Sequence, residues 1–152
     1  MLTRSALRHA GQVADWNKGI IEEFRANEGK VGGYFEGATV LLLHTTGRRS
    51  GKEHVTPLVY LPDGERWAVV GSKGGAPADP DWVRNLEANG EATIEVGTET
   101  IPVRATEILR GGPEWEDLYA RQVARREGFA DYLVKTEGIR TIPVIVLERR
   151  AV

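Results

Sequence analysis

A short segment between two apolar stretches gathers residue types that bind anions. Residues 45–52 read Thr-Thr-Gly-Arg-Arg-Ser-Gly-Lys, so three cations, hydroxyl groups and two glycines share one tight connection. Guanidinium forks and backbone N–H groups in such a connection can converge on phosphate or carboxylate oxygens. The alternative is a solvated hairpin tip whose charges keep a sheet edge from pairing. From these residues alone, the solvated tip is the favoured interpretation.

A second segment has the composition of a loop that approaches a flat ligand. Residues 71–76 read Gly-Ser-Lys-Gly-Gly-Ala, and Ser72 and Lys73 add hydrogen-bond donors. Glycine allows the backbone to come close to a planar ring, although Gly74-Gly75 is also typical of a simple flexible turn. The strands attached to the two segments flank a turn at 62–65, so both segments are expected at one end of a barrel. Together they predict a joint site for an anion and a ring.

Aromatic residues could wall such a site, although each is more often a core residue. The candidates are Trp82, Tyr60, Phe129 and Tyr132. Trp16 and Trp115 lie on helical apolar stripes and are predicted to be core. Arg125-Arg126-Glu127 is interpreted as a solvated helix end.

The elements that must position these residues follow from periodicity and turn signals. Helices are predicted over 13–28, over 80–89 with Asp79 as N-cap, and from Pro113 onward. Strands are predicted over residues 39–45, 54–61, 67–71, 92–97, 100–107 and 141–147. Strands in adjacent hairpins predict a mainly β (α+β) fold, an antiparallel barrel with peripheral helices. The expected organisation is an N-terminal helical segment, 1–36, packed on a cofactor-binding barrel, 37–150.

Composition excludes several classes of function. The 152 residues suffice for one domain, and a net charge of −2 gives no field that would recruit nucleic acid. The chain has no cysteine, and its three histidines lack metal-ligand spacing, so neither a thiol site nor a metal site is expected. Residues 47–53 lack the spacing of a P-loop, and no G-x-G-x-x-G opens a dinucleotide fold.

The cellular location of the protein is predicted from the composition of its N-terminal residues. Residues 1–12 hold no apolar signal core, which favours the cytoplasm. The acidic face of the 13–28 helix, with Glu22, Glu23 and Glu28, would be repelled by anionic lipid, so packing on the barrel is preferred over membrane contact.

An ordered set of motifs resembles one family. The stretches Leu-Leu-Leu-His-Thr-Thr-Gly-Arg-Arg-Ser-Gly (41–51) and Thr-Pro-Leu (56–58) are similar to those of the actinobacterial deazaflavin (F420)-dependent nitroreductases and quinone reductases. The resemblance continues through residues 72–76, 80–86 and 140–143, and covers roughly 37–148. Each motif is weak alone, but the ordered set is specific.

The resemblance implies a split β-barrel that binds coenzyme F420. Arg48, Arg49, Ser50 and Lys52 would hold the phosphate and oligoglutamate tail, with His54 where family members often have arginine. Residues 72–76 (Ser72, Lys73, Gly74, Gly75 and Ala76) would lie along the deazaflavin ring, and Trp82 would shape the pocket.

The implied activity is hydride transfer from reduced F420 to a quinone, enone or nitro compound. Ser72 and Tyr132 are the expected catalytic residues, Ser72 polarising an oxygen and Tyr132 donating a hydrogen bond or proton. Tyr60, Phe129 and Tyr132 are expected on the acceptor side, with Val59 near the place of a family tyrosine. Two alternatives stay open, an FMN-dependent oxidoreductase of the same barrel class and a non-catalytic F420 carrier. Monomer and homodimer both remain open.

Overall fold

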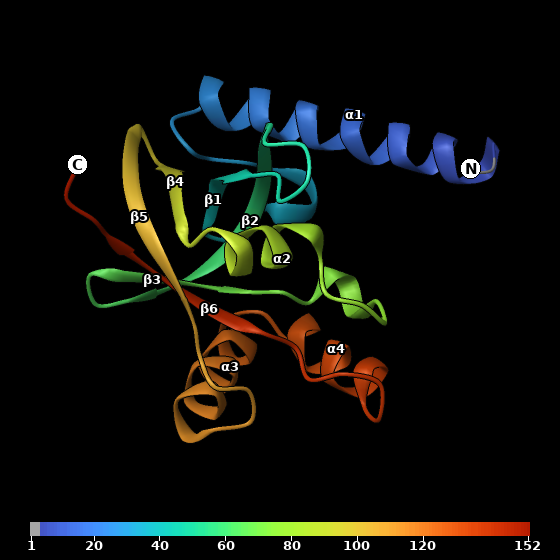
Figure 1. Ribbon diagram of the computed structural model, residues 1–152, viewed down its shortest axis with the longest axis vertical. Coiled ribbons are helices and arrows are strands. Elements are labelled where there is room, and N and C mark those ends of the chain that lie inside the picture. The colour runs from blue at the N-terminus through green and yellow to red at the C-terminus, as the bar shows by residue number, and fades with distance from the viewer. Residues whose placement is uncertain (1–3) are drawn as a thin grey trace.

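A closed barrel of six strands forms the centre of the molecule in the computed structural model, which describes residues 4–152, with side chains from Asp15 onward. Neighbouring strands are all antiparallel, in the order β1-β2-β3-β6-β5-β4 (Figure 1). The strands are β1 (Val40–Thr46), β2 (Glu53–Asp63), β3 (Arg66–Val70), β4 (Glu91–Val96), β5 (Glu99–Glu107) and β6 (Val144–Arg149). The predicted mainly β barrel with peripheral helices is confirmed, and each predicted strand is present within a few residues of its expected bounds.

Helices cover the outside and one end of the barrel (Figure 1). The α-helices are α1 (Arg4–Ala26), α2 (Asp81–Ala88), α3 (Pro113–Arg125) and α4 (Gly128–Thr136), with short 3₁₀ turns η1 (Gly33–Phe35) and η2 (Lys73–Gly75). None of these helices is long and apolar enough to cross a bilayer. The helix α4 was not predicted, because its nine residues are too few for a clear apolar period.

The strand β1 is apolar on both faces, which explains its unbroken run of large side chains. Leu41 and Leu43 join the core inside the barrel, where Ile94 and Ile145 also pack. Leu42 points the other way and packs against Phe24 of α1. A strand buried on both sides reads as a continuous apolar run rather than an alternation.

The helix α1 starts earlier than the predicted 13–28 and ends close to the expected stop. It spans residues 4–26, and the chain leaves it through Glu28 and Gly29, whose φ angles are 57° and 91°. A Cβ on Gly29 would lie 2.7 Å from Cα of Gly97, so only glycine fits there. This close contact fixes the end of α1 on the β4–β5 turn.

Asp79 does not cap α2, contrary to the prediction. Pro80 occupies the N-cap position, and no side chain caps the helix. Asp79 instead accepts hydrogen bonds from Arg140 and Arg110, both at 2.9 Å. Two charge-assisted contacts outweigh one bond to a helix N–H.

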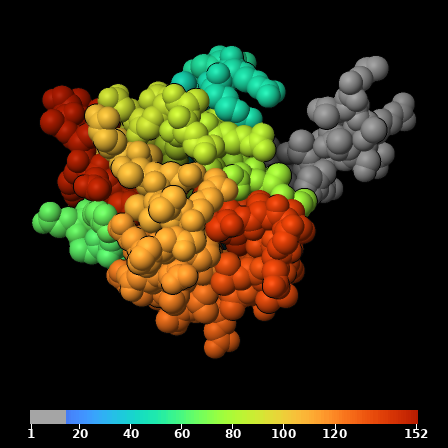
Figure 2. All heavy atoms as spheres, turned by 60° about the horizontal axis from the view of Figure 1, so that its bottom comes forward, coloured from blue at the N-terminus to red at the C-terminus, as the bar shows by residue number. Residues whose placement is uncertain are grey.

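The helices α3 and α4 lie side by side (Figures 1 and 2), and Figure 1 shows them across the barrel from α1. Leu118, Tyr119 and Phe129 pack with Val144 and Val146 of β6 in one apolar cluster. The α4 helix also contacts η2. This packing brings the far C-terminal part of the chain beside the 71–76 loop.

Candidate functional site

The β1–β2 loop is a rigid turn, not a loose hairpin tip. The Gly47 N–H donates to Lys52 O at 2.7 Å, and the Gly51 N–H donates to Gly47 O at 2.9 Å. A Cβ on Gly47 would lie 2.5 Å from Ser50 Oγ and 2.8 Å from His54 Nε2. A side chain at 47 would therefore displace the Ser50 or His54 side chain, and the two backbone bonds hold the turn that carries Arg48 and Arg49.

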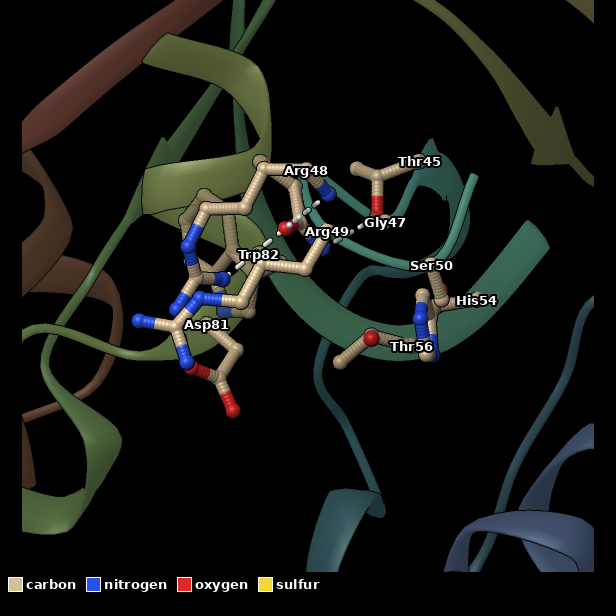
Figure 3. A pocket seen from close by; sticks show the side chains of 10 residues that line it. Thr45, Gly47, Arg48, Arg49, Ser50, His54, Thr56, Asp81 and Trp82 are labelled. Atoms are coloured by element: carbon tan, nitrogen blue, oxygen red, sulfur yellow. Dashed lines mark hydrogen bonds and ion pairs between the residues drawn. The ribbon is translucent and has the colours of Figure 1, made fainter. Parts of the chain in front are cut away.

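A basic pocket of about 340 Å³ lies between this loop and the start of α2. Figure 3 shows Arg48 and Arg49 on the side of Asp81 and Trp82, with Ser50, His54 and Thr56 across from them. The lining residues, here called the basic pocket, are Thr45, Gly47, Arg48, Arg49, Ser50, His54, Thr56, Asp81, Trp82 and Asn85. In the described part of the chain Arg49 makes no ion pair, so its charge is available to an anion.

Asn85 organises this pocket, although the sequence indicated no role for it beyond its place in the 80–86 motif. It is 4% exposed, and its Oδ1 accepts hydrogen bonds from the Arg48 backbone N–H at 3.2 Å and from Arg48 Nη1 at 3.0 Å. Arg48 also donates to Asp81 Oδ1 at 3.3 Å. The sequence did contain a signal for this role, because an asparagine on the buried face of a short helix must find polar partners.

The backbone of the 71–76 loop has the geometry of an anion-binding nest. Ser72 is right-handed helical, and Lys73, Gly74 and Gly75 follow with φ angles of 46°, 64° and 85°. The sequence of a right-handed and then a left-handed residue forms a concave nest of N–H groups. Among the described residues, no acceptor receives the N–H groups of Ser72, Lys73 or Gly74, so these donors are free for a ligand.

A single buried arginine holds that loop in place. Arg140 donates to the carbonyl oxygens of Gly71, Ser72 and Ala76, at 3.1, 2.9 and 2.9 Å. Its Nη1 also pairs with Asp79, and its side chain is 9% exposed. A bond from Arg140 Nη2 to the Ser72 carbonyl leaves the Ser72 hydroxyl unconstrained.

A second, mostly apolar pocket of about 310 Å³ lies beneath this loop. Its lining residues, here called the ring pocket, are Trp16, Tyr34, Phe35, Thr56, Pro57, Leu58, Val59, Ser72, Lys73, Gly74, Pro80, Trp82, Arg126, Phe129 and Tyr132. Thr56 and Trp82 line both this pocket and the basic pocket. Because β1, β2 and β3 are antiparallel neighbours, the two loops lie at the same end of the barrel, as their order along the chain predicted.

One rim of the ring pocket is closed by a pair of tyrosines. The Tyr34 and Tyr132 hydroxyls lie 3.2 Å apart, and the Arg126 guanidinium lies 5.2 Å from the centre of the Tyr34 ring. Burial and the hydrogen bond with Tyr34 raise the pKa of Tyr132 to about 12. Tyr132 therefore keeps its proton at neutral pH and can act as a hydrogen-bond donor.

Trp16 belongs to this rim, not to the core as predicted. It is 48% exposed and contacts Tyr34 and Phe35, with ring centres 6.4 and 5.6 Å apart. The helical stripe correctly placed Trp16 on the inner face of α1, but that face extends beyond the barrel wall and overhangs the ring pocket.

Ten of the fourteen predicted site residues line one or both pockets. Arg48, Arg49, Ser50 and His54 line the basic pocket, whereas Ser72, Lys73, Gly74, Phe129 and Tyr132 line the ring pocket, and Trp82 lines both. The remaining four, Lys52, Gly75, Ala76 and Tyr60, line neither pocket.

For two of these four residues the structure shows why they lie outside both pockets. A Cβ on Gly75 would lie 2.7 Å from Lys135 Cδ, so α4 covers that residue. Tyr60 borders a separate hollow beside Trp67 and Arg149, further along β2. Pro57, Leu58 and Val59 take the place on β2 that was expected for Tyr60.

Comparison with known proteins identifies relatives that share most of the chain. A family model described as F420H(2)-dependent quinone reductase matches residues 16–149. An F420H(2)-dependent quinone reductase of Mycobacterium tuberculosis is 36% identical over 131 residues, which cover 84% of this chain and 85% of that protein.

Solved structures agree with the sequence comparison. A structure described as an F420-H2 dependent reductase superposes with a TM-score of 0.65 and 32% identity, over 78% of this chain and all of that one. A second structure, described as a domain-swapped dimer, superposes with a TM-score of 0.66 and 31% identity, over 91% of this chain and 98% of that one.

Proposed function

Because the chain belongs to the F420H(2)-dependent quinone reductase family, we propose that it binds reduced F420 and passes a hydride to a quinone. The observation that carries this proposal is that the basic pocket and the ring pocket are neighbours, with Thr56 and Trp82 in the walls of both. A ligand with a flat apolar ring and an anionic tail matches that pair of compartments.

The residues present fit the cofactor. Deazaflavin is planar, and the ring pocket offers Trp82 and Pro57 as walls and the N–H nest at 72–74 as donors. The tail is polyanionic, and Arg49 and Lys73 carry charges that no described carboxylate neutralises. Binding of FMN, with one phosphate, would leave part of this charge unmatched, which favours F420.

Hydride transfer comes from the cofactor, because reduced F420 supplies the hydride when bound. The protein's own residues orient the cofactor and the acceptor and shield both from water. We propose that the Ser72 hydroxyl and the nest donate hydrogen bonds to a carbonyl oxygen in the ring pocket, and that Tyr132 donates a further one. Trp16 and Tyr34 reduce access of water from the open side.

The identity of the electron acceptor and the oligomeric state are proposed as well. The name of the family supports a quinone, and enones and nitro compounds are further candidates. One structural relative is described as a domain-swapped dimer, which supports a test for a homodimer by light scattering. A cytoplasmic location rests on the sequence alone.

Two measurements test the proposal. Titration of the purified protein should show F420 binding more tightly than FMN, and F420H2 absorbance should decay when menadione is added. Arg104→Gln is a control variant for both measurements, because Arg104 is exposed and its one ion pair among the described residues is with Glu91 on β4. Tight F420 binding without oxidation by quinones, enones or nitro compounds would instead establish the carrier alternative, and preference for FMN would refute the cofactor assignment.

A further inference from the structure

A third hollow, of about 300 Å³, adjoins the ring pocket on the side away from the basic pocket. Its lining residues, here called the arginine pocket, are Glu36, Gly37, Ala38, Thr39, Val59, Gln122, Arg125 and Arg126. Val59 and Arg126 line both this hollow and the ring pocket. The two spaces are therefore neighbours that share these two residues in their walls.

Gln122, in the wall of the arginine pocket, lacks hydrogen-bond partners. The residue is 2% exposed, and neither Oε1 nor Nε2 has a partner among the described residues. An unsatisfied buried amide destabilises a protein by about 1–3 kcal/mol, so such groups are rare unless a ligand or water completes them. The amide can both donate and accept.

Two cations at this pocket also lack carboxylate partners. Neither Arg125 nor Arg126 forms an ion pair in the described part of the chain, although Glu36 lies on the same wall. The Arg126 guanidinium donates to the Tyr34 carbonyl oxygen and rests on the Tyr34 ring, whereas Arg125 has no hydrogen-bond partner there.

Stabilisation of the C-terminus of α3 would account for the charges alone. It would not account for the hollow or for the orphaned amide of Gln122. Arg121, one turn earlier on the same helix, is paired with Asp63 and Asp117, so this helix neutralises its arginines where no pocket adjoins them.

We propose that the acceptor extends from the ring pocket past Val59 into the arginine pocket, and that it carries a carboxylate there, held by Arg125 and Gln122. This inference rests on the proposed function and adds the substrate class, a quinone with a short acidic side chain. The reaction is unchanged: the quinone gains one hydride and one proton to become the hydroquinone, and the carboxylate takes no part. A guanidinium and an amide suit a carboxylate, which accepts from both.

The test compares three naphthoquinones that differ only in the side chain: one with a carboxypropyl arm, its methyl ester, and menadione. With wild-type protein and F420H2, kcat/KM for the acid should exceed that for the ester by at least about tenfold, the effect of one charge-assisted contact. In Arg125→Gln the acid-to-ester ratio should fall to about one, whereas Arg104→Gln should keep the wild-type ratio. Equal rates for acid and ester in the wild type would overturn the proposal.

A binding measurement tests the proposed carboxylate site without relying on catalysis. The acid and the ester are titrated into F420-free protein, with quenching of tryptophan fluorescence as the signal, since Trp16 and Trp82 line the ring pocket. Tighter binding of the acid, lost in Arg125→Gln and competitive with menadione, supports the proposal. Acid binding that menadione does not displace would show a separate anion site and overturn it. Failure of all three quinones to oxidise F420H2 would refute the proposed function. The titration would still show whether the arginine pocket binds the carboxylate.

Discussion

Arg140 Nη1 lies 2.9 Å from Asp79 Oδ1, and this pair joins the segment that follows α4 to the segment that follows the 71–76 loop, which lines the ring pocket. The partners are 61 positions apart in sequence. The same guanidinium binds three carbonyl oxygens of residues 71–76. The conformation of the nest at 72–74 therefore depends on a residue that does not itself line the ring pocket.

Replacing Arg140 should destabilise the protein and loosen the nest. Arg140→Ala leaves Asp79 with one partner, Arg110, and removes the donor to three carbonyl oxygens, so we expect a loss of about 1–3 kcal/mol in the free energy of unfolding. Arg140→Lys keeps the charge but cannot span four oxygens, so an intermediate loss is expected. Urea unfolding measures both, with Arg149→Gln as control, since its pair with Glu99 is exposed and contributes at most about 1 kcal/mol. Wild-type stability in Arg140→Ala would contradict this role.

Arg49 of the 45–52 loop and Lys73 of the 71–76 loop form no ion pair among the described residues. Their charges should determine the affinity for the anionic tail of F420. Arg49→Ala and Lys73→Ala should each weaken F420 binding by about 1.5–3 kcal/mol through loss of a charge-assisted contact. The loss should shrink as salt rises, because exposed charges are screened. Isothermal titration at two ionic strengths measures this, with Arg104→Gln alongside. Unchanged affinity in both variants would place the tail elsewhere.

A side chain at Gly47 should disturb the basic pocket. In Gly47→Ala the new Cβ would lie 2.5 Å from Ser50 Oγ, with His54 Nε2 at 2.8 Å, so these two pocket-lining side chains must move. We expect a destabilisation of about 1–3 kcal/mol together with weaker F420 binding. Gly19→Ala is the control, because nothing lies within 4 Å of its Cβ position on α1, and alanine there should stabilise the helix by about 0.5–1 kcal/mol. Equal behaviour of the two variants would refute the steric argument.

The sequence predicted what depends on local pattern and missed what depends on distant contacts. The strands, the turn at 62–65 and the two loops at one barrel end follow from residue types and chain direction. The role of Tyr34 does not, because its partner Tyr132 is 98 positions away. Arg126 similarly looked like a solvated helix end, yet it lines two pockets because η1 folds against it.

The pH dependence of stability should reveal the Tyr34–Tyr132 contact. The pKa of Tyr132 is raised to about 12 in the folded protein, above the ordinary value near 10 for an unfolded chain. Above pH 10 the unfolded state releases this proton first, so stability falls as pH rises from about 10 to 12. Asp131 raises the pKa further and Arg126 opposes the shift.

Urea unfolding between pH 9 and 11.5 should therefore give a steeper decline for the wild type than for Tyr132→Phe. Tyr119, whose pKa is raised by burial, is present in both proteins, so the difference isolates Tyr132. Parallel pH profiles would show that the hydroxyl of Tyr132 is not in the environment described.

Removing the orphaned amide of Gln122 should stabilise the ligand-free protein. Methionine has nearly the same shape and no amide, so Gln122→Met removes the desolvation penalty of two unpaired polar atoms, and we expect about 1–3 kcal/mol of added stability. The same variant should bind the carboxypropyl naphthoquinone more weakly, because one of its two proposed partners is gone. Leu118→Met is a matched control, since Leu118 is equally buried on α3 and loses no polar group, so a small loss is expected there. A destabilised Gln122→Met protein would mean that ordered water already satisfies the amide, and the argument for a ligand at this position would fail.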